Sequence, residues 1–286
     1  MPPFQATEGV QTGRGGGFRL RDAFAIGKEK GYEVTLFKFW QPDEMARLCA
    51  EALDADIEVN YAREVIRRNE LVPQGLPETL ERWPWLVRIR TFGSFEIEVS
   101  EKAVVFTRKV QKKPLALLRA IISLGGRRVN AERLEDLLWP EAEGDAAHVA
   151  FKSAVLRLRR LLGNERAVEV REGMVSLNSK VVWLDTWVLE SLAERTSRAY
   201  RSAGPEWSAE DVKYLSSLVL DFYRGDFLGG TDDPWAGYYR RRARSLFTKT
   251  VEKLKDMLNR AGRAAEAIRF YEMACERGAK QEAEKG

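Results

Sequence analysis

The stretch Ala146–Gly163, with the sequence AAHVAFKSAVLRLRRLLG, decides how the rest of the chain is interpreted. Its apolar residues Phe151, Val155, Leu158 and Leu162 are spaced i, i+4, i+7, i+11, which predicts a helix with one packed stripe. The other side chains include the cationic or hydrogen-bonding His148, Lys152, Ser153, Arg157, Arg159 and Arg160. Such a helix can lie in the major groove of DNA and donate to bases and phosphates. An ordinary amphipathic surface helix has the same pattern, so the flanking segments decide.

The composition is that of a water-soluble globular protein. The chain has 286 residues, enough for two or three domains, and 44% of them are hydrophobic while 31% are charged. No apolar run approaches the length of a membrane span, and the N-terminus lacks the apolar core of a signal peptide. We therefore expect a cytoplasmic protein with no membrane partner. Cys49 and Cys275 lie in helical patterns and are expected to be buried thiols.

The net charge of +4 is mild, but positive charge is concentrated in one segment. Between Lys102 and Ala131 the chain has basic residues and no acidic one. The basic residues are Lys102, Arg108, Lys109, Lys112, Lys113, Arg119, Arg127 and Arg128. A run of one sign favours an anionic partner, and a solvated surface is the alternative.

The N-terminal part predicts a tail followed by a small helical region. Residues 1–17 are polar and Gly-rich and are expected to be disordered. Their glycines lack the Gly-Lys-Ser/Thr ending of a phosphate-binding loop. Residues 18–85 form the helical region, which ends in a Pro-rich linker at 71–85. Its expected helices are Phe18–Lys30, one beginning at Pro42, and Val59–Arg68, while Val34–Trp40 fits a strand or the start of a helix.

The segment 86–184 predicts an α+β domain. Alternating apolar residues in Leu86–Phe106 predict strands, the last of them at Ala103–Phe106, and Pro114–Leu124 predicts a helix that Gly125-Gly126 ends. Val129 suits an isolated β-bridge, and Asn130 is a good N-cap for a helix through Leu138.

The second half of this domain contains the helix at 146–162 and a hairpin. An acidic loop, Pro140–Asp145, precedes the helix. The runs Ala167–Arg171 and Met174–Leu177 flank Glu172-Gly173, a pair that suits a tight hairpin. A last strand is expected at Val181–Leu184. In this order of elements, helix 131–138 supports the helix at 146–162 in the major groove, and the hairpin touches the backbone or the minor groove.

This segment resembles the OmpR/PhoB-type winged helix, which has a β-sheet before its helices. The resemblance rests on Gly-Gly-Arg-Arg-Val-Asn at 125–130, Leu134, Leu-Trp-Pro at 138–140, Val-Leu-Arg-Leu-Arg-Arg at 155–160, and Gly173. The spacing of Leu-Trp-Pro and Arg-Leu-Arg-Arg is most similar to SARP-type (antibiotic-regulator) activators. The loop 140–145 corresponds to the place where relatives contact RNA polymerase, although here it carries Glu141, Glu143 and Asp145.

The C-terminal part, 185–286, predicts helices at Trp187–Ala199, Ala209–Tyr223, Pro234–Leu258 and Ala264–Glu276. Gly262, Ala267, Tyr271 and Ala274 fit the second half of a tetratricopeptide-type repeat. The run Tyr-Arg-Gly-Asp-Phe-Leu at 223–228, followed by Asp-Pro-Trp at 233–235, resembles the bacterial transcriptional activator domain of SARP-type proteins, here incomplete. Residues 32–85 resemble the segment before the winged helix in large proteobacterial regulators with an upstream ATPase and repeats. The resemblance implies the output part of such a regulator, or a shortened gene.

Several residues also have structural interpretations. His148 fits a capping or packing role as well as a DNA contact, and Arg159 and Arg160 complement the helix dipole. Arg240–Arg242 and Arg244 form a second basic cluster, which we expect to be a solvated helix face. Trp183, Trp187 and Trp235 are expected to lie in the core or between domains.

The sequence thus predicts a winged helix-turn-helix domain at 86–184, followed by an all-α tetratricopeptide-like domain at 185–286. We expect a DNA-binding transcriptional activator with a phosphorelay-type output domain. Its expected partners are double-stranded DNA, RNA polymerase and a second copy of the chain. The predicted DNA-binding residues are His148, Lys152, Ser153, Arg157, Arg159, Arg160, Arg171, Lys112, Lys113, Arg127 and Arg128. With one histidine and no metal-ligand spacing, we expect no enzyme, cofactor or metal. The alternative is a protein-interaction scaffold whose winged helix has lost DNA binding.

Overall fold

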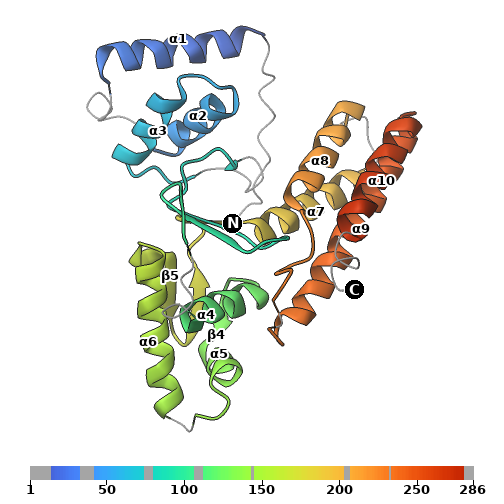
Figure 1. Ribbon diagram of the computed structural model, residues 1–286. Helices are drawn as coiled ribbons and strands as arrows, with labels where there is room; N and C mark the ends of the chain where they lie inside the picture. Colours follow the sequence, from blue (N-terminus) through green and yellow to red (C-terminus); the bar gives the residue numbers. More distant parts are fainter. Residues whose placement is uncertain are drawn as a thin grey trace, which may run out of the picture. The chain divides into compact units, whose positions relative to one another are not determined.

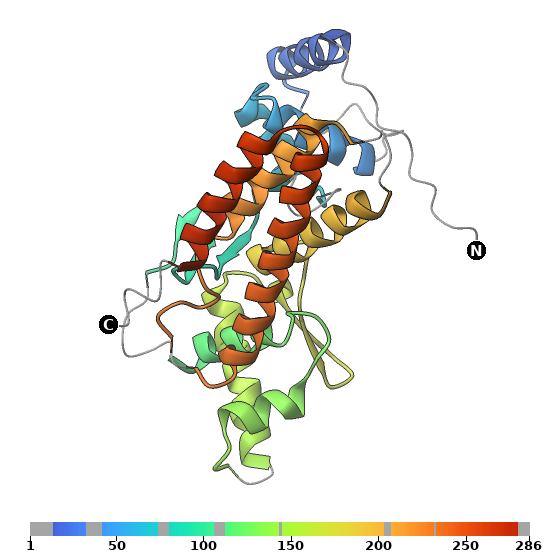
Figure 2. The same ribbon diagram turned by 90° about the vertical axis from the view of Figure 1, so that its right-hand side faces the viewer.

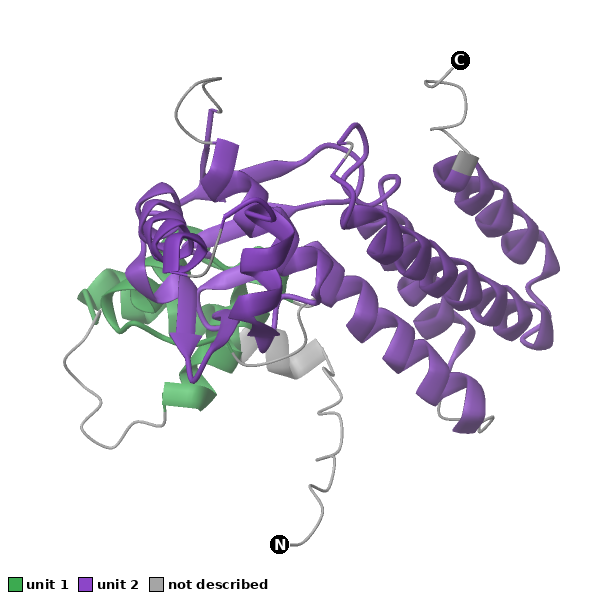
Figure 3. Ribbon diagram, turned by 90° about the horizontal axis from the view of Figure 1, so that it is seen from below, with its two compact units in different colours: residues 1–75, 79–84 green, residues 76–78, 85–286 purple. Residues whose placement is uncertain are grey.

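The chain forms two compact units, which are coloured separately in Figure 3. Unit 1 comprises residues 1–75 and 79–84, and unit 2 comprises residues 76–78 and 85–286. The computed structural model describes residues 14–32, 42–73, 80–105, 112–142, 145–202, 207–231 and 233–279. The predictions for Val34–Trp40, Arg108, Lys109 and Glu143 lie outside these ranges. The described chain is mostly helical with two small sheets, and none of its helices is long and apolar enough to cross a bilayer.

Unit 1 contains the helices α1 (Arg14–Lys30), α2 (Pro42–Asp54) and α3 (Val59–Arg68). The predicted helix starts at Pro42 and Val59 are confirmed. Helix α1 begins before Phe18, so the expectation of disorder is wrong for residues 14–17. A formed helix can extend into glycines because each added residue contributes a hydrogen bond once the nucleus exists. Cys49 is buried in this unit, as expected, and burial raises the pKa of its thiol to about 12.

A four-stranded sheet begins unit 2. Its strands are β1 (Val87–Arg90), β2 (Glu96–Val99), β3 (Lys102–Ala103) and β7 (Val182–Leu184), in the order β3-β2-β1-β7. Strands β1 and β2 are antiparallel, whereas β7 runs parallel to β1 with Val87 opposite Val182. The predicted last strand is therefore confirmed, and it returns the chain to the edge of the first hairpin. Helix α7 (Asp185–Ser202) starts directly after it.

Three helices lie between the strands of this sheet in the sequence. They are α4 (Lys112–Ser123), α5 (Ala131–Leu138) and α6 (Asp145–Leu161). Leu117, Leu118, Ile121 and Ile122 of α4 are fully buried, so α4 is the central helix of the three. The predicted N-cap of α5 is confirmed, because Asn130 Oδ1 accepts a hydrogen bond of 3.0 Å from the backbone N–H of Arg133.

A second sheet has three strands in the order β4-β6-β5. They are β4 (Val129–Asn130), β5 (Val168–Arg171) and β6 (Met174–Leu177), and a short 3-10 turn, η2 (Glu165–Ala167), precedes β5. The predicted hairpin is confirmed: Glu172 and Gly173 have φ of 51° and 72°, as the two central residues of a type I′ turn require. Val129 is part of a two-residue strand rather than an isolated bridge, because Asn130 also pairs with β6.

The C-terminal half of unit 2 consists of α7, α8 (Ala209–Phe222), α9 (Ala236–Arg260) and α10 (Ala264–Ala279). Figures 1 and 2 show α8, α9 and α10 side by side. Cys275 on α10 is exposed, so the expectation of a buried thiol is wrong there. The buried residues of α10 are Ala267, Phe270 and Ala274, and the next residue along a helix turns about 100° away from such a stripe.

The Tyr-Arg-Gly-Asp-Phe-Leu run at 223–228 joins these helices to the first sheet. Leu228 N–H donates to Thr91 O at 2.7 Å, and Phe92 forms a β-bridge with Phe227. The Tyr223 ring packs against Phe92 and stacks on Phe247 of α9 with 3.8 Å between centroids. This conserved geometry of backbone and rings gives the run a structural role within unit 2.

Candidate nucleic-acid interface

The inner side of α6 holds the helix in unit 2. Ala147, Phe151, Ala154, Val155 and Leu158 are buried, and they place α6 against α4 and α5. The predicted stripe is therefore confirmed. Because this side is fixed by packing, the opposite side is presented as a rigid surface.

The outer side of α6 carries cationic and hydroxyl groups that the fold does not use. Lys152, Ser153, Arg157 and Arg160 are exposed. Within the described part of the chain, their side chains form no hydrogen bond or ion pair. We call these four residues the α6 polar face. Its three cations have every donor available for an external anion, and Asp145 in the first turn is the only acid of α6.

His148 and Arg159, by contrast, fasten α6 to its neighbours. His148 Nδ1 lies 2.9 Å from Oε1 of Glu135, a mostly buried carboxylate on α5. Arg159 Nε–H donates to the carbonyl of Val168 at the start of β5, at 2.9 Å. These two predicted DNA-binding residues have structural partners at the flanks of the polar face, and a role in DNA binding stays a prediction.

The β5–β6 hairpin presents Arg171 beside its tight turn. The Arg171 side chain is 80% exposed and lies 3.3 Å from the carboxylate of Glu169. Glu169 also accepts a hydrogen bond from Asn178 Nδ2. An exposed ion pair of this kind contributes little to stability, so Arg171 can exchange its partner for a phosphate at small cost.

The remaining predicted basic residues lie around α4 and the 125–130 segment. Lys112 is exposed, whereas Lys113 Nζ donates to Leu138 O at 2.7 Å and lies over the Trp139 ring. The Arg127 guanidinium stacks over Trp187 at 4.5 Å, which satisfies it partly within the fold. Arg128 has a φ of 49° and donates its backbone N–H to Ser176, leaving its side chain exposed. The basic run is thus partly structural.

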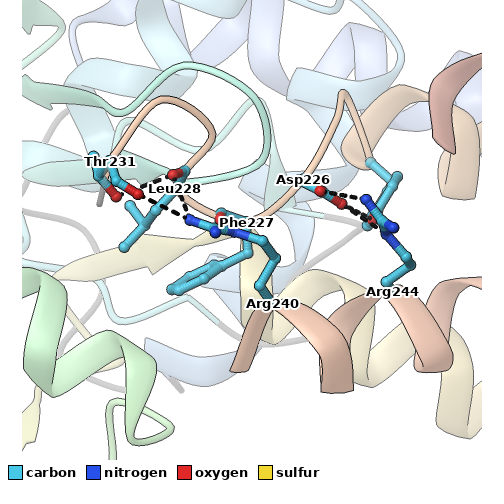
Figure 4. A network of polar contacts seen from close by, with 7 residues as sticks. Asp226, Phe227, Leu228, Thr231, Arg240 and Arg244 are labelled. Carbon is cyan, nitrogen blue, oxygen red and sulfur yellow. Dashed lines mark hydrogen bonds and ion pairs between the residues drawn. The ribbon is translucent and has the colours of Figure 1, made fainter. Parts of the chain in front are cut away.

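The second basic cluster, on α9, is not simply a solvated face. Figure 4 shows Arg240 and Arg244 binding the loop after the Tyr-Arg-Gly-Asp-Phe-Leu run. Arg240 donates to the carbonyls of Phe227, Leu228 and Thr231 at 2.9–3.2 Å. Arg244 forms a two-pronged ion pair with Asp226. The expectation was wrong for these two arginines because their acceptors come from another element; Arg241 and Arg242 are exposed.

The tryptophans expected in the core are buried at Trp183 and Trp187, while Trp235 is half-buried. Two exposed aliphatic residues on α6, Val149 and Leu156, were not singled out from the sequence. Their positions opposite the buried stripe could have identified them, because seven residues bring a helix back to nearly the same side. Among the described residues, no cluster of His, Cys, Asp and Glu could hold a metal ion.

Comparison with known proteins places part of this chain near a bacterial regulator. No protein-family model matches the chain. Over 153 residues it is 28% identical to "Regulatory protein AfsR" of Streptomyces griseus, a match that covers 54% of this chain and 15% of AfsR. The structure of Mycobacterium tuberculosis EmbR in complex with a low-affinity phosphopeptide aligns with 64% of this chain and 48% of that chain, with 18% identity and a TM-score of 0.47. The present chain is thus similar to a small part of a much longer regulatory protein.

Proposed function

We propose that this chain is a SARP-type DNA-binding regulator of transcription, in which residues 86–184 form a winged helix and α6 is the recognition helix. The α6 polar face carries this proposal. Lys152, Arg157 and Arg160 project from a helix whose other side is fixed by packing, and the fold supplies none of them with a partner among the described residues. Exposed cations on a rigid helix suit the edges and phosphates of a major groove.

Two further observations support the proposal. The hairpin that follows α6 presents Arg171 at its turn, as a wing beside a recognition helix would. The similarity to the regulatory protein AfsR agrees with a role in regulation. We further propose that the C-terminal helices mediate self-association or contact RNA polymerase and that the protein acts as an activator.

The proposal is tested by titrating the whole chain with fluorescent duplexes, one selected from random sequence and one unselected. Lys152→Ala and Arg157→Ala should each weaken binding to the selected duplex by about 1–3 kcal/mol, with much less effect on the unselected one. Arg171→Ala should weaken both duplexes similarly and reduce the slope of log K against log salt by about one. Arg198→Ala, an exposed arginine on α7, is the matched control.

Binding that is absent at low salt, or that does not change with salt, contradicts the proposal and favours the interaction scaffold. If Lys152→Ala and Arg157→Ala keep the preference for the selected duplex while a substitution outside α6 abolishes it, another element recognises the sequence.

A further inference from the structure

Two large aliphatic side chains stand on the outer side of α6, among the polar residues. Val149 is 64% exposed and Leu156 is 44% exposed. The apolar stripe that packs α6 is complete without them, since Phe151, Val155 and Leu158 are buried. Single exposed aliphatic residues are common on protein surfaces, so the position of these two is what matters.

Val149 and Leu156 share one side of the helix with Lys152. Seven residues, or about two turns, separate the pair, which places them about 10 Å apart along the helix axis. Lys152 lies between them, three residues from one and four from the other, and both spacings keep side chains on the same side. The outer side of α6 therefore alternates an aliphatic, a cationic and a second aliphatic group.

The charges around the aliphatic pair indicate what they contact. Arg157 and Arg160 flank Leu156, and a purely apolar protein surface would leave these cations and Lys152 without counter-charges when it covered them. A DNA major groove offers phosphates for the cations and one kind of apolar group on its base edges, the C5-methyl of thymine. The combination of groups on α6 matches that combination in the groove.

Building on the proposed DNA binding by α6, we propose that Val149 and Leu156 recognise the methyl groups of two thymines. A separation of about 10 Å corresponds to about three base steps at 3.4 Å per step along a strand. The pair would thus select thymines about three base pairs apart, on either strand, with Lys152 over the intervening edge. Cytosine lacks this methyl group and is discriminated against at both positions.

The test replaces each thymine of the selected duplex, one at a time, by deoxyuridine, which lacks the C5-methyl group and keeps the same base pairing. Removal of one contacted methyl should weaken binding of the unaltered chain about three- to fivefold, the effect of one buried carbon. Two such thymines, about three base pairs apart, are expected, and deoxyuridine elsewhere in the duplex should have no effect.

The variants assign the contacts. Val149→Ala should remove the response to deoxyuridine at one of the two positions and Leu156→Ala at the other, with the remaining response unchanged. Ile268→Ala on α10 is the matched control, because Ile268 is 57% exposed and lies outside the winged helix. Thermal unfolding of both α6 variants should match that of the unaltered chain, since neither side chain is buried.

The outcomes separate this inference from the proposed function. Salt-dependent binding with no response to deoxyuridine at any thymine, or a selected site without thymine, overturns the inference and leaves the proposed function standing. Variants that weaken binding but keep both responses also overturn it. Absence of DNA binding at low salt overturns both proposals.

Discussion

Two helices of this protein carry neighbouring arginines, and the structure uses them in opposite ways. On α9, Arg240 and Arg244 are bound to backbone carbonyls and to Asp226 within unit 2. On α6, Arg157 and Arg160 extend from the fold without a partner among the described residues. The sequence around both pairs is similarly basic, so the number of positive charges does not identify a binding surface.

The difference comes from where acceptors lie. The loop before α9 turns its carbonyls and the Asp226 carboxylate toward one side of that helix, and an arginine there replaces water in satisfying them. No loop crosses the outer side of α6 in the described chain. An arginine that satisfies buried acceptors stabilises the fold, whereas an exposed one with free donors is available to an anion.

The comparison can be sharpened with a buried carboxylate that binds no arginine side chain. Asp185 accepts hydrogen bonds from the backbone N–H groups of Thr91 and Phe92 and from the Thr91 hydroxyl. Burial raises its pKa from 3.8 to about 6, although these hydrogen bonds oppose the shift. The folded state therefore binds this proton more tightly than the unfolded state. The resulting stabilisation is complete below pH 3.8 and is lost as the pH rises through about 6.

Asp185→Asn tests this directly, because the amide does not titrate and can still accept the backbone hydrogen bonds. The free energy of unfolding of the unaltered chain, minus that of the variant, should fall by roughly 3 kcal/mol between pH 4 and pH 7, at about 1.4 kcal/mol per pKa unit. Urea denaturation across this range measures it. A difference that stays flat, or that rises with pH, means that the hydrogen bonds outweigh burial and the carboxylate is stabilised as the anion.

The arginine pair on α9 should give the next largest effect. Arg240→Ala and Arg244→Ala should each lower the free energy of unfolding by about 2–3 kcal/mol, because they leave carbonyls or Asp226 without charged donors. Arg241→Ala and Arg242→Ala are the controls on the same helix, and Arg157→Ala and Arg160→Ala are those on α6; each should change stability by less than about 0.5 kcal/mol. Equal effects at all six positions would abolish the distinction between the two helices.

Local features of the fold could be predicted from sequence because their causes are local. Asn130 caps the helix that follows it, Glu172-Gly173 supplies the two positive φ angles of its turn, and the α6 stripe determines the buried side. Contacts between distant segments could not be predicted in this way. Asp185 and Thr91 are 94 residues apart, and Arg119 and Asp233, which form an ion pair at 2.5 Å, are 114 apart.

The candidate site shows the same division. The pattern of α6 identified Lys152, Ser153, Arg157 and Arg160 as outward-facing, since a helix fixes which residues oppose its buried stripe. It could not show that Arg159 donates to Val168 or that Lys113 donates to Leu138, because these acceptors are backbone carbonyls that every segment possesses. Tertiary structure alone distinguishes an engaged cation from an available one.

The salt dependence of DNA binding by paired variants tests the central claim most directly. The unaltered chain should show a slope of log K against log salt of roughly −4 to −5, and the double variant Arg157→Ala, Arg160→Ala should reduce its magnitude by about two, since each neutralised phosphate contributes about 0.9. The double variant Arg241→Ala, Arg242→Ala on α9 removes the same charge and should leave the slope unchanged. If the α9 variant loses the slope and the α6 variant keeps it, or if both keep it, α6 is not the surface that binds DNA.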